Sequence, residues 1–276
     1  MSLITLTTDF GNKDHFVGSV KGAIHSEIPN VNIIEISNEI SPFNIIEGAY
    51  IIENAYKNFP KGSIHILGVD SEKNPENKHL VLLLDDHFFI CADNGIMSLV
   101  AKRIKPDKII EINIHNSNSS SFTVLDVFIK VAAHIYRGGS IDLVGKRINN
   151  LRELYTISPV LNENNNEITG NVIYIDNYEN IVTNISKTIF EDFGKSRSYF
   201  INARNYRFNS IVNSYSESIK FDVSKEIRKE EGKKIAIFNK GNFLELAIYK
   251  SNPSITGGAS SLFGLKYGDV ISVKFY

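Results

Sequence analysis

The first eleven residues predict a buried strand that delivers a carboxylate to the edge of a sheet. The apolar, β-branched run 3–8 ends in Asp9-Phe10-Gly11, and an amphipathic segment, residues 16–28, follows. A strand, an acidic glycine turn and a helix form the repeating unit of open α/β sheets, in which ligands bind at the carboxyl edge. Taken alone, Asp9 and Asp14 are more simply explained as turn and helix-capping residues.

The alternation of strand-like and helix-like segments continues to about residue 136. Strands are predicted at 31–36, 63–69 and 109–112, a hairpin at 80–84 and 88–92, and helices at 44–56, 94–104 and 125–136. After the polar turn 162–166, short strands predominate, at 170–175, 181–185, 198–201, 235–238, 243–249 and 269–275, and the charged segment 225–234 is predicted as an exposed loop. The fold class is therefore α/β, with an N-terminal α/β domain (1–158) built on a mostly parallel central sheet and a C-terminal β-barrel-like domain (165–276).

Composition excludes several classes of partner. The 276 residues are 42% hydrophobic and 22% charged, with a net charge of −1, so no basic surplus exists to neutralise the phosphates of a nucleic acid. No apolar run approaches the roughly 20 residues of a membrane span, and no secretory leader is evident, so we expect a cytoplasmic protein. The single cysteine, Cys91, lies in an apolar run and is predicted to be a buried, inert thiol.

The common catalytic motifs are missing, and polar residues instead follow the predicted strands. The sequence holds no glycine-rich phosphate loop, no nucleophile elbow and no zinc motif, so neither a metal nor a cofactor is expected. His25, His65 and His134 are predicted to lie at the core edge or surface, whereas His15 and His79 fall in candidate loops. Each strand-end residue could merely cap a helix, but four on one sheet edge exceed what capping needs: Asp9, Asn38, Asp70 and Asn94. Phe10, Phe43 and Phe122 lie near the same ends and could stack on a purine or simply pack.

Seven segments, in this order and spacing, carry a resemblance to a known family. They are TLTTDFGNKDHFVGSVKGAI, VNIIEISNEISPFNIIEGAYII, FPKGSIHILGVD, ADNGIMSLV, VIYIDNYENIVTNI, FNKGNFLELAI and GGASSLFGLKYGDVISV. The chain resembles the S-adenosyl-L-methionine (SAM) hydroxide adenosyltransferases, the adenosine-forming SAM hydrolases to whose superfamily fluorinase and chlorinase belong. The resemblance implies a homotrimer, with each SAM site between the N-terminal domain of one subunit and the C-terminal domain of its neighbour.

The resemblance also implies a substrate-binding set. Carried over by position, Asp9 and Asp14 would meet the ribose, and Phe43 would form the apolar wall. Asp176 and Asn180 would bind the amino and carboxylate groups of the methionine part. The adenine would be contacted, largely through backbone groups, by Asn239, Phe243, Gly258 and Ala259. Phe10 and Asn94, from the strand-end cluster, complete the predicted set.

The implied reaction is attack at C5′ of SAM, in line with the departing sulfur. In the hydrolases, water or hydroxide attacks, and the products are adenosine and L-methionine; in the halogenating members a halide attacks. Positioning and exclusion of competing water can supply most of the rate, because the sulfonium is already a good leaving group. The run from Leu80 to Asn94 is too short for the extra loop of fluorinase, so fluorination is not expected.

The sequence departs from the family where the attacking water is handled. Asp70 is kept, but VDPGVG-x-x-R-R reads VDSEKNPENK, so the arginine position falls on Asn77 or, with a one-residue shift, on Lys78. TFHGRD reads SFTVLD, which places Thr123 at the histidine position. The predicted catalytic set is therefore Asp70, Asn77, Lys78 and Thr123, and Lys78, His79 or His115 could replace the lost cation.

Three readings of the function follow. In the first, the chain is a divergent SAM hydrolase with a rebuilt water site. In the second, it binds SAM or adenosine without catalysis, because an unassisted aspartate is a weak base at pH 7. In the third, the altered pocket admits a different nucleophile at C5′ or another nucleoside substrate.

Overall fold

The chain forms two compact units, each with a hydrophobic core of its own. A computed structural model describes residues 3–102, 104–114, 122–228, 230 and 232–276. Unit 1 is Met1–Tyr155 and unit 2 is Thr156–Tyr276. Within the described residues, no helix has the length and apolar character needed to cross a membrane.

Unit 1 is built on a seven-stranded, mostly parallel sheet. Its strands are β1 (Ile4–Thr8), β2 (Ile33–Ser37), β3 (Ile64–Gly68), β4 (His79–Leu84), β5 (His87–Ala92), β6 (Lys108–Ile112) and β7 (Gly145–Arg147). The order is β2-β1-β3-β5-β4-β6-β7, in which β2, β1, β3 and β5 are parallel and β4 pairs antiparallel with both of its neighbours. Every residue of β1 and β3 is buried, the threonines of β1 and His65 of β3 included, as expected for parallel strands covered on both faces.

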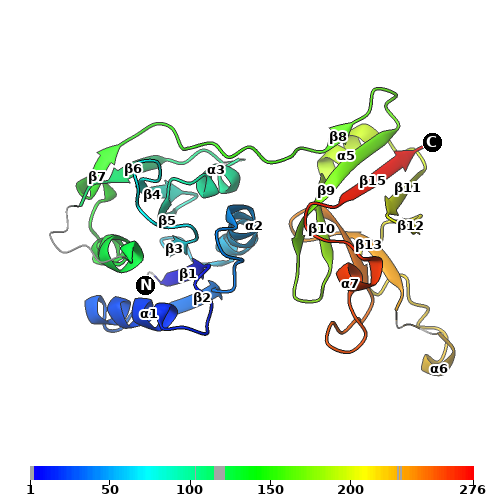
Figure 1. Cartoon of the computed structure of the whole chain (residues 1–276), viewed down its shortest axis with the longest axis horizontal. Coiled ribbons are helices and arrows are strands. Elements are labelled where there is room, and N and C mark those ends of the chain that lie inside the picture. Colours follow the sequence, from blue (N-terminus) through cyan, green and yellow to red (C-terminus); the bar gives the residue numbers. More distant parts are fainter. Residues whose placement is uncertain (1–2, 103, 115–121, 229, 231) are drawn as a thin grey trace. The chain divides into compact units, whose positions relative to one another are not determined.

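Helices cover both faces of this sheet. They are α1 (Phe16–Glu27), α2 (Ile45–Ala55), α3 (Ile96–Val100), a π-helical turn η2 (Val124–Phe128), and α4 (Ile129–Tyr136), with 3₁₀ turns at η1 (Tyr56–Asn58) and η3 (Ile141–Leu143). Figure 1 shows α1 and α4 against one face and α2 and α3 against the other. Two separate core clusters match this arrangement, one including Phe128 and the other Phe89. The predicted helix 94–104 is wrong in length, since α3 ends at Val100.

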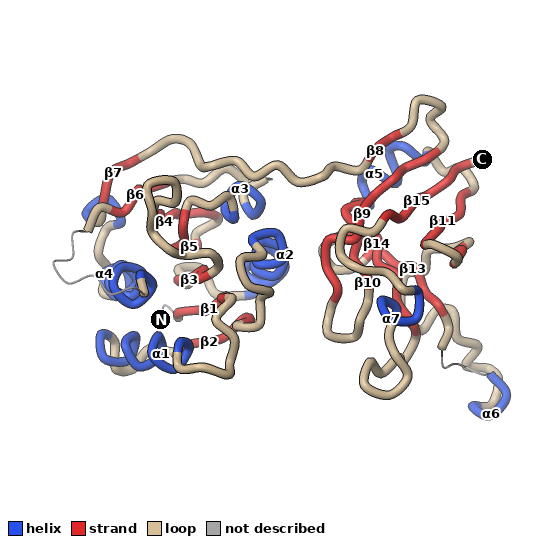
Figure 2. Tube along the Cα trace, in the orientation of Figure 1, coloured by secondary structure: helices blue, strands red, loops and turns tan. Residues whose placement is uncertain are grey.

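Unit 2 is an antiparallel sheet that curls into a nearly closed barrel, as predicted. Its strands are β8 (Val160–Leu161), β9 (Glu167–Ile175), β10 (Ile181–Ser186), β11 (Tyr199–Ala203), β12 (Tyr206–Phe208), β13 (Lys234–Phe238), β14 (Phe243–Ile248) and β15 (Val270–Phe275). The order is β12-β11-β15-β9-β10-β14-β13, with β8 beside β9, and Figure 2 shows these strands in red. Val212, just after β12, bridges to Ile237 of β13 and so brings the two edges together.

Unit 2 also carries three short helices that the sequence analysis missed. They are α5 (Lys187–Gly194), α6 (Lys225–Arg228) and α7 (Ala259–Phe263). Ser186 caps α5 by accepting the Ile189 amide, a signal that the sequence does contain. The prediction of an exposed loop over 225–234 is wrong, because it contains α6 and because Glu230 is only 4% exposed and pairs with Lys250 at 2.8 Å.

Candidate functional site

Asp9, directly after β1, ties together two loops that are distant in sequence. Its Oδ2 accepts the Phe43 amide at 3.0 Å and the Asp70 amide at 3.2 Å. Phe43 and Asp70 both have left-handed backbones, with φ of 61° and 44°, a conformation that costs about 1–3 kcal/mol in a non-glycine residue. The Asp9 carboxylate therefore stabilises two strained residues, a role beyond a local turn. The N-cap of α1 is His15, so the interpretation of Asp14 as the helix cap is wrong.

An aromatic cavity of about 400 Å³ opens beside Asp9. It is lined by Asp9, Phe10, Phe16, Pro42, Phe43, Asp70, Ser71, Glu72, Phe122 and Thr123. The rings of Phe10 and Phe122 meet edge to face at 5.0 Å, and Phe43 is 73% exposed. A Cβ at Gly68 would lie 2.8 Å from Phe10 Cζ, so glycine there leaves room for the ring. The volume and the mixture of apolar walls with a few carboxylates are those of a small-molecule site.

A second, polar cavity of about 300 Å³ shares Asp70 with the first. It is lined by Ile45, Asp70, Asn74, Glu76, Asn77, Asn94, Arg152, Glu153 and Leu154. Asn94 is 4% exposed; its Nδ2 donates to the carbonyls of Val69 at 2.9 Å and Asp70 at 3.1 Å. Asn94 thus fixes the backbone of Asp70 from one side while Asp9 fixes it from the other. Asp70 lies where the aromatic and polar cavities meet.

The structure separates the two alternatives for the lost arginine. Asn77 is 8% exposed and lines the polar cavity. Lys78 is absent from that lining and pairs instead with Glu111 at 2.9 Å. In this structure Lys78 pairs with Glu111 and does not line the polar cavity, which favours Asn77 over Lys78 at the arginine position.

His79 does not supply the missing cation either. It is fully buried, its Nε2 lies 3.0 Å from the Ser71 carbonyl, and its ring packs on Phe128. Burial lowers the pKa of His79 to about 4, so the imidazole is neutral near pH 7. His115, the third candidate, lies outside the described residues.

The remaining candidate residues of unit 1 fall into two groups, those that line a cavity and those that do not. Thr123 and Phe10 line the aromatic cavity, and Thr123 directly precedes the π-helical turn η2, a local form that often marks functional sites. Asp14 is exposed ahead of α1 and lines neither cavity. Sequence reasoning missed Arg152, which lies about 75 residues beyond Asn77 in a stretch without any recognisable motif. It also missed Phe16, which looked like an ordinary residue of an amphipathic helix.

In unit 2, Asp176 and Asn180 form a closed turn between β9 and β10. Asp176 Oδ1 accepts the amides of Tyr178 and Asn180, and Oδ2 accepts Asn180 Nδ2 at 2.9 Å. Glu179, at the same turn, accepts hydrogen bonds through Oε2 from the Ser261 hydroxyl and from the Gly258 amide, the latter at 2.8 Å. These hydrogen bonds lower the pKa of Glu179. A Cβ at Gly258 would lie 2.4 Å from the Tyr178 carbonyl oxygen. The structure therefore brings together Asp176, Asn180, Gly258 and Ala259.

Asn239 and Phe243 lie at the other end of the β10–β14 pair. Phe243 faces Ser186, whereas Ile181, next to Asn180, faces Leu246. Asn239 Oδ1 accepts the Phe243 amide at 3.2 Å, and its Nδ2 donates to Glu245, which is 4% exposed. Burial raises the pKa of Glu245, and the nearby Asp176 carboxylate adds to that shift. The predicted adenine contacts are thus split between the two ends of this strand pair.

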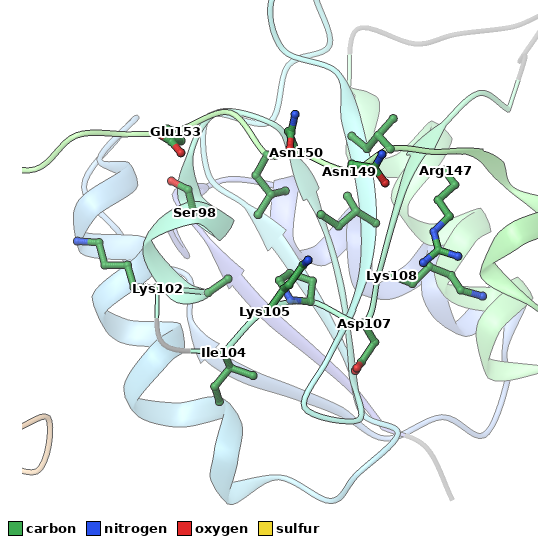
Figure 3. Close-up of a pocket in the computed structure, with 15 residues that line it drawn as sticks. Ser98, Lys102, Ile104, Lys105, Asp107, Lys108, Arg147, Asn149, Asn150 and Glu153 are labelled. Carbon is green, nitrogen blue, oxygen red and sulfur yellow. The ribbon is translucent and has the colours of Figure 1, made fainter.

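A larger cavity, of about 620 Å³, lies elsewhere in unit 1 and contains none of the predicted site residues. Figure 3 shows Lys102 on the opposite side of this cavity from Lys108 and Arg147. Lys108 is already paired with Asp142 at 2.6 Å. The charged groups that line this larger cavity do not converge on one point, so the two cavities at Asp70 remain the candidate site.

Comparison with known proteins gives the same assignment for both units. The model of the SAM hydroxide adenosyltransferase N-terminal domain matches residues 4–145, and that of the C-terminal domain matches residues 170–272. The chain belongs to the SAM hydroxide adenosyltransferase family. A curated (R)-S-adenosyl-L-methionine hydrolase from Methanocaldococcus jannaschii is 30% identical over all of this chain and 97% of its own length.

More distant relatives agree with this membership. An (R)-S-adenosyl-L-methionine hydrolase from Salinispora tropica is 22% identical over 70% of this chain and 76% of its own length. Among solved structures, an uncharacterised conserved protein from Thermotoga maritima superposes with a TM-score of 0.81 at 25% identity, covering 99% of this chain and 100% of its own. The mixed α/β and barrel-like architecture is therefore shared with the Thermotoga maritima protein.

Proposed function

We propose that this protein hydrolyses SAM to adenosine and L-methionine. The observation that carries the proposal is the position of Asp70 between an aromatic cavity and a polar one. Support comes from the full-length identity to the Methanocaldococcus jannaschii protein, which is named an (R)-S-adenosyl-L-methionine hydrolase. The aromatic cavity would hold the nucleoside part, and water would approach C5′ from the polar side.

The reaction needs no cofactor. A bond forms between the water oxygen and C5′, the C5′–S bond breaks, and its electron pair neutralises the sulfonium as methionine leaves. Asp70 accepts the proton that the water loses. General base assistance of this kind contributes about 10²–10⁴-fold, and holding the water in line with sulfur contributes through proximity.

The other candidates would bind and orient SAM. Asp9 would meet the ribose while holding Phe43 and Asp70, and Phe10, Phe43 and Thr123 would form the wall. In unit 2, the turn of Asp176 and Asn180 would bind the methionine part. The turns at Gly258 and Asn239 would present backbone groups to adenine.

The test is incubation of purified protein with SAM in H₂¹⁸O, followed by chromatography and mass spectrometry. We expect adenosine that carries ¹⁸O at O5′, together with unlabelled methionine, and none of either with Asp70→Asn. Unlabelled adenosine would contradict attack by water at C5′. Equal adenosine formation by wild type and Asp70→Asn would remove Asp70 from the reaction.

One observation favours a second candidate, a protein that binds SAM or adenosine without turning it over. Asn77 and Thr123 occupy the positions of the family's arginine and histidine, and neither can carry positive charge. Calorimetry would then show tight adenosine binding in a protein that forms no adenosine from SAM. Turnover that appears only with added chloride or bromide would instead indicate transfer of another nucleophile.

We also propose a homotrimer in which unit 2 of one copy completes the site on unit 1 of another, acting in the cytoplasm. The support is the distribution of the candidate residues over both units, and the reduced, buried Cys91 suits a reducing compartment. Light scattering should give three times the chain mass. After subunit exchange, mixing Asp70→Asn with Asn180→Ala should raise turnover at low SAM concentration above that of either variant alone, because some sites then carry neither change.

A further inference from the structure

The segment that carries Arg152 is fixed against the start of α3. The Arg152 amide donates to Asp93 Oδ1 at 2.9 Å, and the Leu154 amide donates to Ser98 Oγ at 3.1 Å. A Cβ at Gly95 would lie 2.6 Å from Leu154 Cβ, so glycine is what lets this segment approach so closely. The backbone of residues 152–154 is therefore held in place over the carboxyl edge of the sheet.

The guanidinium of Arg152 is directed toward the loop that precedes β4. Nη1 donates to Asn77 Oδ1 at 2.8 Å and, more weakly, to the Glu76 carbonyl at 3.4 Å. Asn77 is itself fixed, since its amide donates to Asn74 Oδ1 at 2.9 Å. Among the described residues, Nε and Nη2 of Arg152 have no partner, so both can still donate to a ligand in the polar cavity.

The polar cavity needs a cation if a hydroxide-like oxygen is to form there. Its described lining includes the carboxylates of Asp70, Glu76 and Glu153, all of which disfavour an anionic oxygen. Arg152 is the one basic side chain among the described residues of that lining. Lys78 is paired with Glu111, and His79 is neutral near pH 7.

We propose that Arg152 is a catalytic residue that donates a hydrogen bond to the attacking water. This inference rests on the proposed SAM hydrolysis. Asp70 takes a proton from the water, the guanidinium stabilises the hydroxide-like oxygen so formed, and this oxygen then bonds to C5′ as the C5′–S bond breaks. Arg152 keeps its own proton throughout. Asn77 then acts as a positioning residue, because it orients the guanidinium without needing to touch the water.

The experiment compares Arg152→Gln with Arg137→Gln, an exposed arginine of the same unit whose Nη2 donates to the Glu27 carbonyl at 2.7 Å. Steady-state formation of adenosine is measured from pH 6 to 10, adenosine affinity by calorimetry and stability by thermal melting. We expect kcat at pH 7 to fall about 10²–10³-fold in Arg152→Gln, as when one transition-state donor is removed. The loss should shrink toward pH 10, where hydroxide is abundant, while the adenosine Kd and the melting temperature stay near wild type. Arg137→Gln should leave kcat, its pH dependence, the adenosine Kd and the melting temperature unchanged.

Chemical rescue separates a catalytic guanidinium from a merely structural one. Arg152→Gly with added ethylguanidinium should regain at least 10-fold in kcat, whereas ethylammonium should not. Arg152→Gln with full kcat would overturn the inference. So would a loss that is equal at every pH, without rescue and with a lowered melting temperature, which indicates a structural role. If Lys78→Gln instead reproduces the pH-dependent loss, the cation is Lys78. A wild-type protein that forms no adenosine at any pH refutes the proposed function itself, a result distinct from all of these.

Discussion

Asp9 of unit 1 and Asp176 of unit 2 hold their neighbours in different ways. In unit 1, the Asp9 carboxylate spans to residues 34 and 61 positions away and keeps two left-handed residues in place. In unit 2, the Asp176 side chain bonds to Tyr178 and Asn180 of its own turn, and the long-range carboxylate is that of the neighbouring Glu179, which accepts the amides of Gly258 and Ser261.

The difference indicates that the two units have different roles, one in the reaction and one in binding. In unit 1 the two strained residues, Phe43 and Asp70, line the candidate site, and strain persists only when its surroundings enforce it. Side chains that satisfy each other inside a turn leave mainly backbone groups for a ligand. We therefore expect substitutions in unit 1 to affect the reaction, and matched substitutions in unit 2 to affect binding.

The largest contrast is expected between Asp70→Asn in unit 1 and Asn180→Ala in unit 2. Asp70→Asn removes the proton acceptor but keeps the backbone bonds to Asp9 and Asn94, so kcat should fall about 10³-fold or more with SAM affinity near wild type. Asn180→Ala should instead raise the Kd for SAM with a smaller effect on the chemical step. Single-turnover kinetics, followed over a range of SAM concentrations up to saturation, measure both the rate of the chemical step and the Kd for SAM. Equal losses of kcat in the two variants would contradict this difference in roles.

A second pair, Asp9→Ala and Asp176→Ala, compares long-range with local bonds. Each change removes hydrogen bonds to a charged acceptor and should lower the free energy of unfolding by about 2–3 kcal/mol. Asp9→Ala should also release Phe43 and Asp70, so SAM affinity should fall about 100-fold or more. Asp176→Ala should cost only about 10-fold. Denaturant melts and calorimetry check the pair, and a larger affinity loss in Asp176→Ala would reverse the comparison.

The sequence predicted the parts of the fold that depend on local pattern. Buried strands such as β1 and β3 are short runs rich in aliphatic and β-branched residues, and the amphipathic period of α1 is plain, so their order predicts a parallel sheet with helices on both faces. The short helices of unit 2 were missed because α7 has only five residues and no apolar repeat of its own. The length of α3 was wrong because the i, i+4 spacing of Val100 and Ile104 extends the helical pattern past Val100 although the helix does not.

The candidate site was predictable only where strand ends define it. Asp9, Asp70 and Asn94 each follow a parallel strand, and topology alone brings them to one edge. Arg152 reaches that edge through contacts with Asp93 and Asn77 on other segments, and no local pattern records such contacts. The choice between Asn77 and Lys78 likewise depends on where two adjacent side chains point, which the sequence does not show.

The third prediction concerns the response of unit 1 to acid. His65 is fully buried, with hydrogen bonds to Thr5 at 2.7 Å and His87 at 3.1 Å, and burial lowers the pKa of His65 to about 3 and that of His87 below its usual value. Since the unfolded chain takes up these protons near pH 6.5, the stability that depends on neutral histidines is present above pH 6.5. It is lost as the pH falls toward 3. At pH 4.5, His65 alone should cost unit 1 about 3 kcal/mol.

Hydrogen exchange followed by mass spectrometry measures this for each unit separately. We expect amides of β1, β3 and β5 to lose protection between pH 6.5 and 4.5 before amides of β9 and β10 do. His65→Asn should flatten the dependence in unit 1 while leaving unit 2 unchanged. Parallel loss of protection in both units would show that the acid response does not originate at His65.

The smallest expected effect has the opposite sign and lies in unit 2. Burial raises the pKa of Glu245, so the folded state disfavours its charge, and the stability associated with protonated Glu245 falls as the pH rises above the unfolded value near 4.5. Glu245→Gln removes that charge while keeping the shape between Tyr215 and Asn239. Thermal melting should therefore show the variant equal to wild type at pH 4 and stabilised by up to about 1 kcal/mol at pH 8. A variant destabilised at pH 8 would mean that the charged carboxylate is needed to hold Asn239, and unit 2 would then share the carboxylate-dependent construction of unit 1.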